Sequence, residues 1–105
     1  MIFVERVFES ASGEVLARFE APYRAEGGEY RCRWHLVWEG GQRSTEIAGL
    51  DGVQALMLAM RNLHAVLTDS DEYREGSLTY IGQRDLDLPP AWGCGPLYNP
   101  DPPPD

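Results

Sequence analysis

The strongest constraint on the fold is a nine-residue stretch, residues 30–38, in which large apolar and polar side chains alternate. One set consists of Tyr30, Cys32, Trp34, Leu36 and Trp38, and the other of Arg31, Arg33, His35 and Val37. A period of two is that of a β-strand with one buried and one solvated face. The sequence therefore predicts a strand over residues 30–38 whose aromatic face packs on a core.

Three further strands are expected in the first half of the chain. Residues 2–8 are rich in β-branched and aromatic side chains, residues 14–21 alternate, and residues 42–48 follow the 30–38 strand. Short Ser/Gly turns at residues 10–13 and 40–41 connect neighbouring strands. Because such turns join antiparallel neighbours, we expect an antiparallel meander.

The periodicity changes at Asp51, where a helix is predicted to begin. Asp51 is a favourable N-cap, and Gln54 is placed to return a hydrogen bond to the backbone N–H of the cap itself. The helix should run to about Thr68. Its inward stripe is predicted to be Val53, Leu56, Met57, Met60, Leu63 and Leu67.

After an acidic loop, residues 77–81 read as a fifth strand, so the expected order is ββββαβ. The fold class is therefore α+β: an antiparallel sheet of four to five strands with one helix packed on one face. Residues 1–88 form the domain. Residues 89–105 are rich in Pro and Gly and are expected to be a partly disordered tail.

Composition narrows the classes of partner. The chain has 105 residues, suited to one domain, and a formal net charge of −8. Nucleic acid and membrane surfaces are therefore not expected partners, because both attract basic proteins. All Lys and Arg positions are Arg, a bias typical of GC-rich bacterial genomes. The sequence shows no signal peptide or membrane-spanning segment, so we expect a cytoplasmic location. In that compartment Cys32 and Cys94 are expected to be reduced.

One segment carries a family resemblance. Ile47, Gly49, Asp51, Gln54, Ala55, Leu56, Leu58 and Ala59 fit an I-x-G-x-D-x-x-Q-A-L-x-L-A pattern. With the strand-rich first half, this resembles an uncharacterised family of short bacterial proteins, a domain of unknown function, over residues 14–90. The resemblance implies the fold and brings no activity with it.

The polar face of the predicted sheet is the first candidate binding surface. Its members are Arg18, Arg31, Arg33, His35 and Glu46. Arg and His side chains bind carboxylates, whereas cross-strand ion pairs over a solvated sheet explain the same residues without a ligand.

The other candidates are an aromatic cavity, an acidic loop and isolated ligand-type residues. Trp34 and Trp38, with Tyr30, Met57 and Met60, would line a ligand pocket or simply fill a core. The loop contains Asp69, Asp71, Glu72 and Glu75. Cys32 is expected to be buried and inert, Cys94 lies in a Gly-Cys-Gly loop, and His64 has no second ligand at helical spacing, so we expect neither a metal nor a cofactor.

No nucleotide-binding, hydrolase or metalloprotease motif is present in the sequence. We therefore expect a non-enzymatic, immunity-like module that binds a protein partner through the sheet face or the acidic loop. The alternatives are a ligand binder with the tryptophan-lined cavity, and a structural homodimer that uses Leu58 and Ala65 on the back of the helix.

Overall fold

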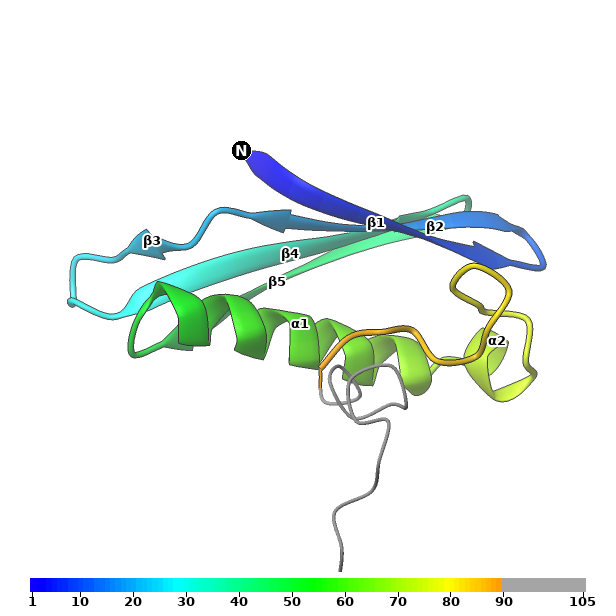
Figure 1. The fold of residues 1–105 in the computed structure, drawn as a ribbon. Coiled ribbons are helices and arrows are strands. Elements are labelled where there is room, and N and C mark those ends of the chain that lie inside the picture. The colour runs from blue at the N-terminus through cyan, green and yellow to red at the C-terminus, as the bar shows by residue number, and fades with distance from the viewer. Residues whose placement is uncertain (90–105) are drawn as a thin grey trace, which may run out of the picture.

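The alternating segments fold into a five-stranded antiparallel sheet, and the helical segments cover one face of it (Figure 1). The computed structural model describes residues 1–89. The elements are β1 (Ile2–Ser10), β2 (Gly13–Glu20), β3 (Tyr23–Arg24), β4 (Tyr30–Trp38), β5 (Gly41–Gly49), α1 (Gly52–Thr68) and α2 (Asp71–Arg74). The predicted α+β class is confirmed. Apart from Pro89, the predicted tail lies outside the described residues.

β4 is the centre of the sheet. β2 and the two-residue β3 both pair with one side of it, β5 pairs with the other side, and β1 pairs with β2. The sequence did not predict β3. The break between β2 and β3 falls at Ala21-Pro22, where Pro has no N–H to donate to a ladder.

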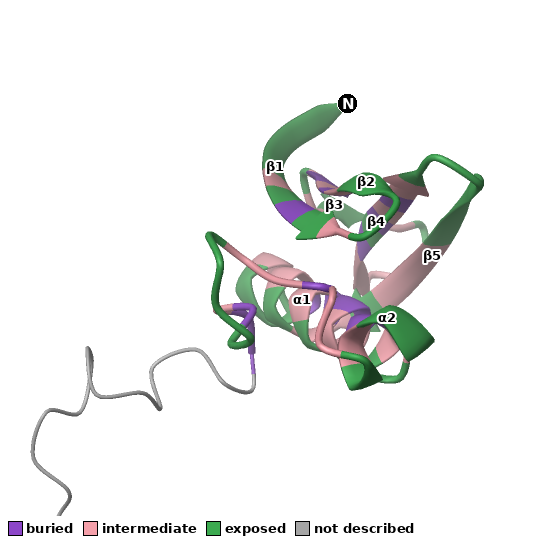
Figure 2. Ribbon diagram, turned by 90° about the vertical axis from the view of Figure 1, so that its right-hand side faces the viewer, coloured by how far each residue is buried: buried purple, intermediate pink, exposed green. Residues whose placement is uncertain are grey.

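The predicted faces of the β4 strand are confirmed. Cys32, Trp34 and Leu36 are buried against the helical layer, while Trp38 at the end of the strand is 40% exposed. Phe8, Ala17 and Phe19 complete the buried face of the sheet. Figure 2 shows these buried stretches in the strands, and those of α1 across from them.

α1 has the predicted length, but the predicted inward stripe is partly wrong. Its buried residues are Ala55, Ala59, Leu63 and Leu67, whereas Val53 and Met57 are 69% and 41% exposed. The cause is a close approach at Gly49, where an added Cβ would lie 2.6 Å from the backbone N of Ala55. Small side chains therefore face the sheet, and the larger Val53 and Met57 are turned outward.

The predicted cap at the start of α1 is present, with one change. A side-chain oxygen of Asp51 accepts a hydrogen bond from the backbone N–H of Gln54 at 2.8 Å. The side chain of Gln54 accepts from the backbone N–H of Leu50 at 2.7 Å, not from that of Asp51 as predicted. The reciprocal pair of bonds still satisfies two backbone donors at the helix entrance.

The expected fifth strand over residues 77–81 is wrong. Thr79 forms an isolated antiparallel bridge with Glu9 at the end of β1, and the chain then turns back. Ile81 and Gly82 have φ values of 50° and 78°, and a second bridge joins Tyr80 to Gln83 across the turn. Pairing therefore ends after one residue because the backbone turns.

Residues 83–89 then run beside α1 and pass in front of it in the view of Figure 1. Leu86 and Leu88 are buried, and the guanidinium group of Arg6 donates to the carbonyl oxygens of Leu86 and Asp87, at 2.6 Å to the latter. This segment closes the β1 side of the core.

Candidate functional site

The polar face of the sheet carries every member of the first candidate surface. Around Glu46 on β5, the carboxylate accepts hydrogen bonds from the hydroxyl of Tyr23 at 2.9 Å, from Arg31 at 3.1 Å and from Arg33 at 3.2 Å. Arg31 also pairs with Glu29 at 3.0 Å. Led by the Tyr23 hydrogen bond and then by Arg31, these contacts lower the pKa of Glu46 below its ordinary value.

His35 and Arg18 are also held by neighbours on this face. The Nε2 of His35 lies 2.7 Å from a carboxylate oxygen of Glu20, and its Nδ1 lies 2.6 Å from the hydroxyl of Ser44. The hydrogen bond from His35 is the main cause of a lowered pKa of Glu20. Arg18 forms an ion pair with Glu5.

The face is thus a set of cross-strand pairs in which every Arg and His of the candidate surface has a carboxylate partner. A carboxylate or phosphate ligand would have to displace these partners. The geometry agrees with the ion-pair explanation given above, and individual exposed pairs stabilise a fold by about 0–1 kcal/mol.

The two tryptophans of the expected cavity do not share one. Trp34 is fully buried in the core, and its Nε1 donates to the side-chain oxygen of Asn62 at 2.9 Å. Met57 and Met60 line a groove on the other side of the molecule. Of the two alternatives, the core explanation therefore holds for Trp34, whereas Trp38 lines a separate pocket away from the methionines.

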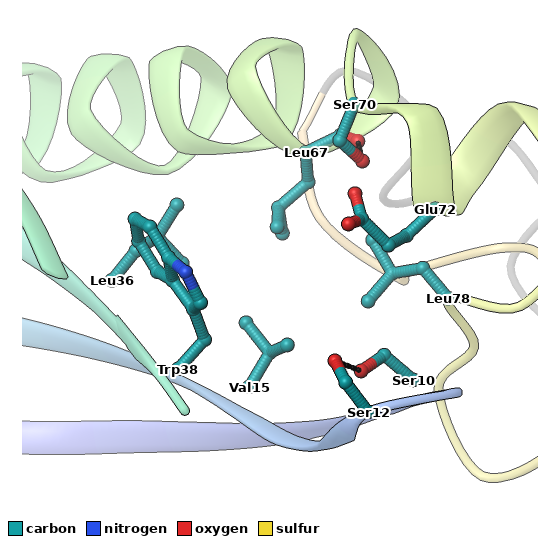
Figure 3. Close-up of a pocket in the computed structure, with 9 residues that line it drawn as sticks. All are labelled: Ser10, Ser12, Val15, Leu36, Trp38, Leu67, Ser70, Glu72 and Leu78. Carbon is teal, nitrogen blue, oxygen red and sulfur yellow. Dashed lines mark hydrogen bonds between the residues drawn. The ribbon is translucent and has the colours of Figure 1, made fainter. Parts of the chain in front are cut away.

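This Trp38 pocket is a cavity of about 220 Å³ (Figure 3). It is lined by Ser10, Ser12, Val15, Leu36, Trp38, Leu67, Ser70, Glu72 and Leu78. The lining comes from the β1–β2 hairpin, the end of β4, the end of α1, the start of α2 and residues 77–79, which we call the bridge segment because Thr79 bridges to Glu9. The sequence did not reveal this pocket because its walls come from five separate segments.

Several carboxylates lie close to the pocket-lining residues in sequence, and one of them, Glu72, lines the pocket itself. We call them the acidic end: Glu14, Glu39, Asp69, Asp71, Glu72 and Glu75. Asp69 and Asp71 pair with Arg74 at 2.7 Å and 3.6 Å. Within residues 1–89, the other four carboxylates form no ion pair, and Glu14 also stands directly across from Glu9 in the β1–β2 ladder, which is unfavourable for like charges.

A second hollow, the β1–α1 groove, has a volume of about 280 Å³. Val4, Glu5, Arg6, Phe19, Met57, Met60, Asp87, Leu88 and Pro89 line it. It is mostly apolar, and its charged members include the ion pair of Arg6 with Asp87. Its walls come from the first half of β1, from β2, from α1 and from residues 87–89.

The isolated ligand-type residues show no common site. Cys32 is buried, as predicted, and burial raises the pKa of its thiol to about 11. Burial likewise lowers the pKa of His64. In the part of the chain that the structure describes, no three His, Cys, Asp or Glu side chains are grouped to hold a metal ion. Cys94 lies outside that part.

Within residues 1–89, no helix combines the length and the apolar character needed to cross a membrane. Comparison with curated proteins and with solved structures found no match to the chain. A family model described as a domain of unknown function (DUF6968) matches residues 4–90, which confirms the expected membership of an uncharacterised domain family. The chain therefore belongs to the DUF6968 family.

Proposed function

We propose that this protein is a non-enzymatic binding module that recognises a basic protein partner through its acidic end. The observation that carries this proposal is the position of Trp38. A tryptophan that is 40% exposed beside an apolar pocket is the kind of residue that contributes most to binding energy at protein interfaces. The surrounding carboxylates would accelerate encounter with a basic partner and select against acidic ones.

The polar sheet face supports the proposal less well. Its arginines already have carboxylate partners, so binding there would exchange one ion pair for another. At the acidic end, Glu39, Glu72 and Glu75 have no such partner among the described residues and remain available to a basic surface.

The test is capture of partners by the tagged protein from a lysate of its own cells, at low salt and at about 1 M salt, where charges are screened beyond about 3 Å. Wild type is compared with Trp38→Ala and with Tyr23→Ala. The two residues are matched aromatics, 40% and 48% exposed, at opposite ends of the sheet. We expect a salt-sensitive partner that Trp38→Ala loses and Tyr23→Ala retains. Loss of the partner in Tyr23→Ala alone would indicate that the binding site is the polar face of the sheet.

Self-association is a second candidate, and the β1–α1 groove favours it. Val4 and Met57 line this groove and are 40% and 41% exposed, and exposed apolar side chains in a groove are available to a second copy of the chain. By contrast, Leu58 is half-buried and lines, with Ala65, a hollow between α1 and Ile47 of β5. A molar mass of twice the chain in light scattering, lost on Met57→Glu, would support a dimer through the groove.

A further inference from the structure

The apolar part of the Trp38 pocket is built from the core itself. Leu36, Leu67 and Leu78 are buried side chains of β4, α1 and the bridge segment, and each exposes an edge to the cavity together with Val15. These positions are fixed by packing, so the pocket exists before any ligand arrives. Its floor suits an aliphatic chain.

One wall of the pocket is the indole ring of Trp38. The ring rests against the Gly40-Gly41 turn, where a Cβ added to either glycine would lie 3.4 Å from a ring atom. The two glycines therefore let the ring lie flat on the turn. This fixes an aromatic surface at the mouth of the cavity.

The opposite wall carries Glu72, the one charged residue that lines the pocket. In Figure 3 its carboxylate points from α2 toward the cavity, across from Trp38. The backbone oxygen of Glu72 accepts hydrogen bonds from the backbone N–H groups of Ser77 and Leu78, at 2.9 Å and 3.1 Å, which anchors this end of α2. Its carboxylate has no hydrogen bond or ion pair among the described residues.

The serine hydroxyls of the lining already have hydrogen-bond partners, and those of Ser10 and Ser12 lie 3.3 Å apart (Figure 3). The hydroxyl of Ser10 donates to the carbonyl oxygen of Gly13 at 2.8 Å, and that of Ser70 donates to the carbonyl oxygen of Leu67 at 2.6 Å. The strongest free polar group facing the cavity is thus an anion. A ligand that complements the pocket carries a positive charge.

We propose that the Trp38 pocket binds a cation carried on an aliphatic stem, that is, an alkylammonium group. Such a stem packs on apolar surface while its charged head stays at the rim. There the head meets the indole ring through a cation–π contact and Glu72 through a charge-assisted hydrogen bond. If the proposed function is right, the natural source is a lysine side chain of the basic partner; the alternative source is a free amine.

The test is an NMR titration of the full chain that follows the indole N–H signal of Trp38, assigned with Trp38→Phe. The probes are pentylammonium, 1-pentanol and pentanoate, which share a stem and differ in charge. We expect saturable shifts with pentylammonium, clearly weaker binding of pentanol and none of pentanoate. Equal affinity for pentanol and pentylammonium would overturn the proposal.

Two carboxylate variants test whether Glu72 is the group that binds the cation. We expect Glu72→Gln to weaken pentylammonium binding about two- to fivefold, as for an exposed ion pair, with pentanol unchanged. Glu26→Gln, an exposed carboxylate in the loop beyond β3, is the matched control and should leave binding unchanged. Equal weakening by both variants would mean that net charge, and not this pocket, attracts the probe.

A capped Gly-Lys-Gly peptide distinguishes the two sources. Peptide affinity equal to or above that of pentylammonium supports a partner's lysine, and weaker peptide binding supports a free amine. The two proposals also fail separately. If Trp38→Ala loses the partner but the wild type does not bind pentylammonium, the pocket chemistry alone is overturned. If the wild type binds pentylammonium but Trp38→Ala still captures the partner, the pocket is supported and the proposed function is overturned.

Discussion

Gly49→Ala should destabilise the protein although it adds a single methyl group. Gly49 ends β5, and an added Cβ would lie 2.6 Å from the backbone N and 2.8 Å from the Cα of Ala55. Ordinary contact begins at 3.4 Å, so the start of α1 would have to move by about 0.8 Å, the difference between 3.4 and 2.6. Ala55 is fully buried, and this movement would open the packing around it.

The expected magnitude follows from two opposing effects. Overpacking costs about 1–3 kcal/mol, whereas replacing Gly by Ala stabilises by about 0.4–1 kcal/mol through the unfolded state. Gly49 does not have the positive φ that would add strain. The net loss should be about 1–2 kcal/mol, or roughly 4–16 °C in Tm for a domain of this size.

The assay is urea unfolding followed by tryptophan fluorescence. Gly40→Ala is the matched control, because its added Cβ would lie 3.4 Å from the ring of Trp38, in ordinary contact, and its φ is not positive. We expect Gly40→Ala to unfold within about 0.5 kcal/mol of wild type, as most surface changes do. A Gly49→Ala variant as stable as this control would refute the close approach of β5 and α1.

Three further predictions follow. Asp51→Ala removes the cap of α1 and should lower the free energy of unfolding by about 0.5–2 kcal/mol, so an unchanged urea midpoint would argue against the cap. Because the folded pKa of Glu46 is below its ordinary 4.5, its stabilising effect should be present above that pH and lost as the pH falls through the folded pKa. Urea midpoints from pH 7 to pH 3 should therefore fall more for wild type than for Glu46→Gln; parallel curves would contradict this. Burial raises the pKa of the Cys32 thiol to about 11, so in a Cys94→Ser variant this thiol should not react with a thiol reagent at pH 8 until urea is added. Rapid labelling of the folded protein would show that Cys32 is not buried.

Local patterns predicted most of the fold. The alternation over residues 30–38 identified the central strand and its buried face because both depend on the period of two alone. The limits of α1 followed from the cap at Asp51 and from the break in apolar spacing at Asp69. The pairing of Arg31 and Arg33 with Glu46 was likewise expected from the alternation on neighbouring strands.

The wrong inner face of α1 and the wrong fifth strand have the same cause: a local sequence pattern does not show how two elements lie relative to each other in the folded protein. Hydrophobicity favoured Val53 and Met57 for the inner face of α1, yet the contact at Gly49 leaves room there for Ala55 and Ala59. Similarly, residues 77–81 looked like a strand because the local pattern does not show that the backbone turns at Ile81 and Gly82, which limits the pairing with β1 to the single bridge between Thr79 and Glu9.

The candidate site was only partly accessible from sequence. The acidic loop and Trp38 were both identified, but as parts of different sites, because their meeting depends on how α2 returns to the end of the sheet. The I-x-G-x-D-x-x-Q-A-L-x-L-A pattern of this chain has a physical explanation in the structure. Gly49, Asp51 and Ala55 serve the approach and the cap of α1, so this pattern reports the fold and not a binding site.

The joining of β1 to the last described segment also affects how the protein is made. Arg6 binds the carbonyl oxygen of Asp87, 81 residues further along, and Glu9 bridges Thr79. During synthesis from the N-terminus, at about 5–20 residues per second, β1 and β2 leave the ribosome seconds before Leu86 and Leu88 do. The apolar side of the first hairpin therefore stays only partly covered until Leu86 and Leu88 emerge, and the core is completed after the helix that covers the rest of it has been made.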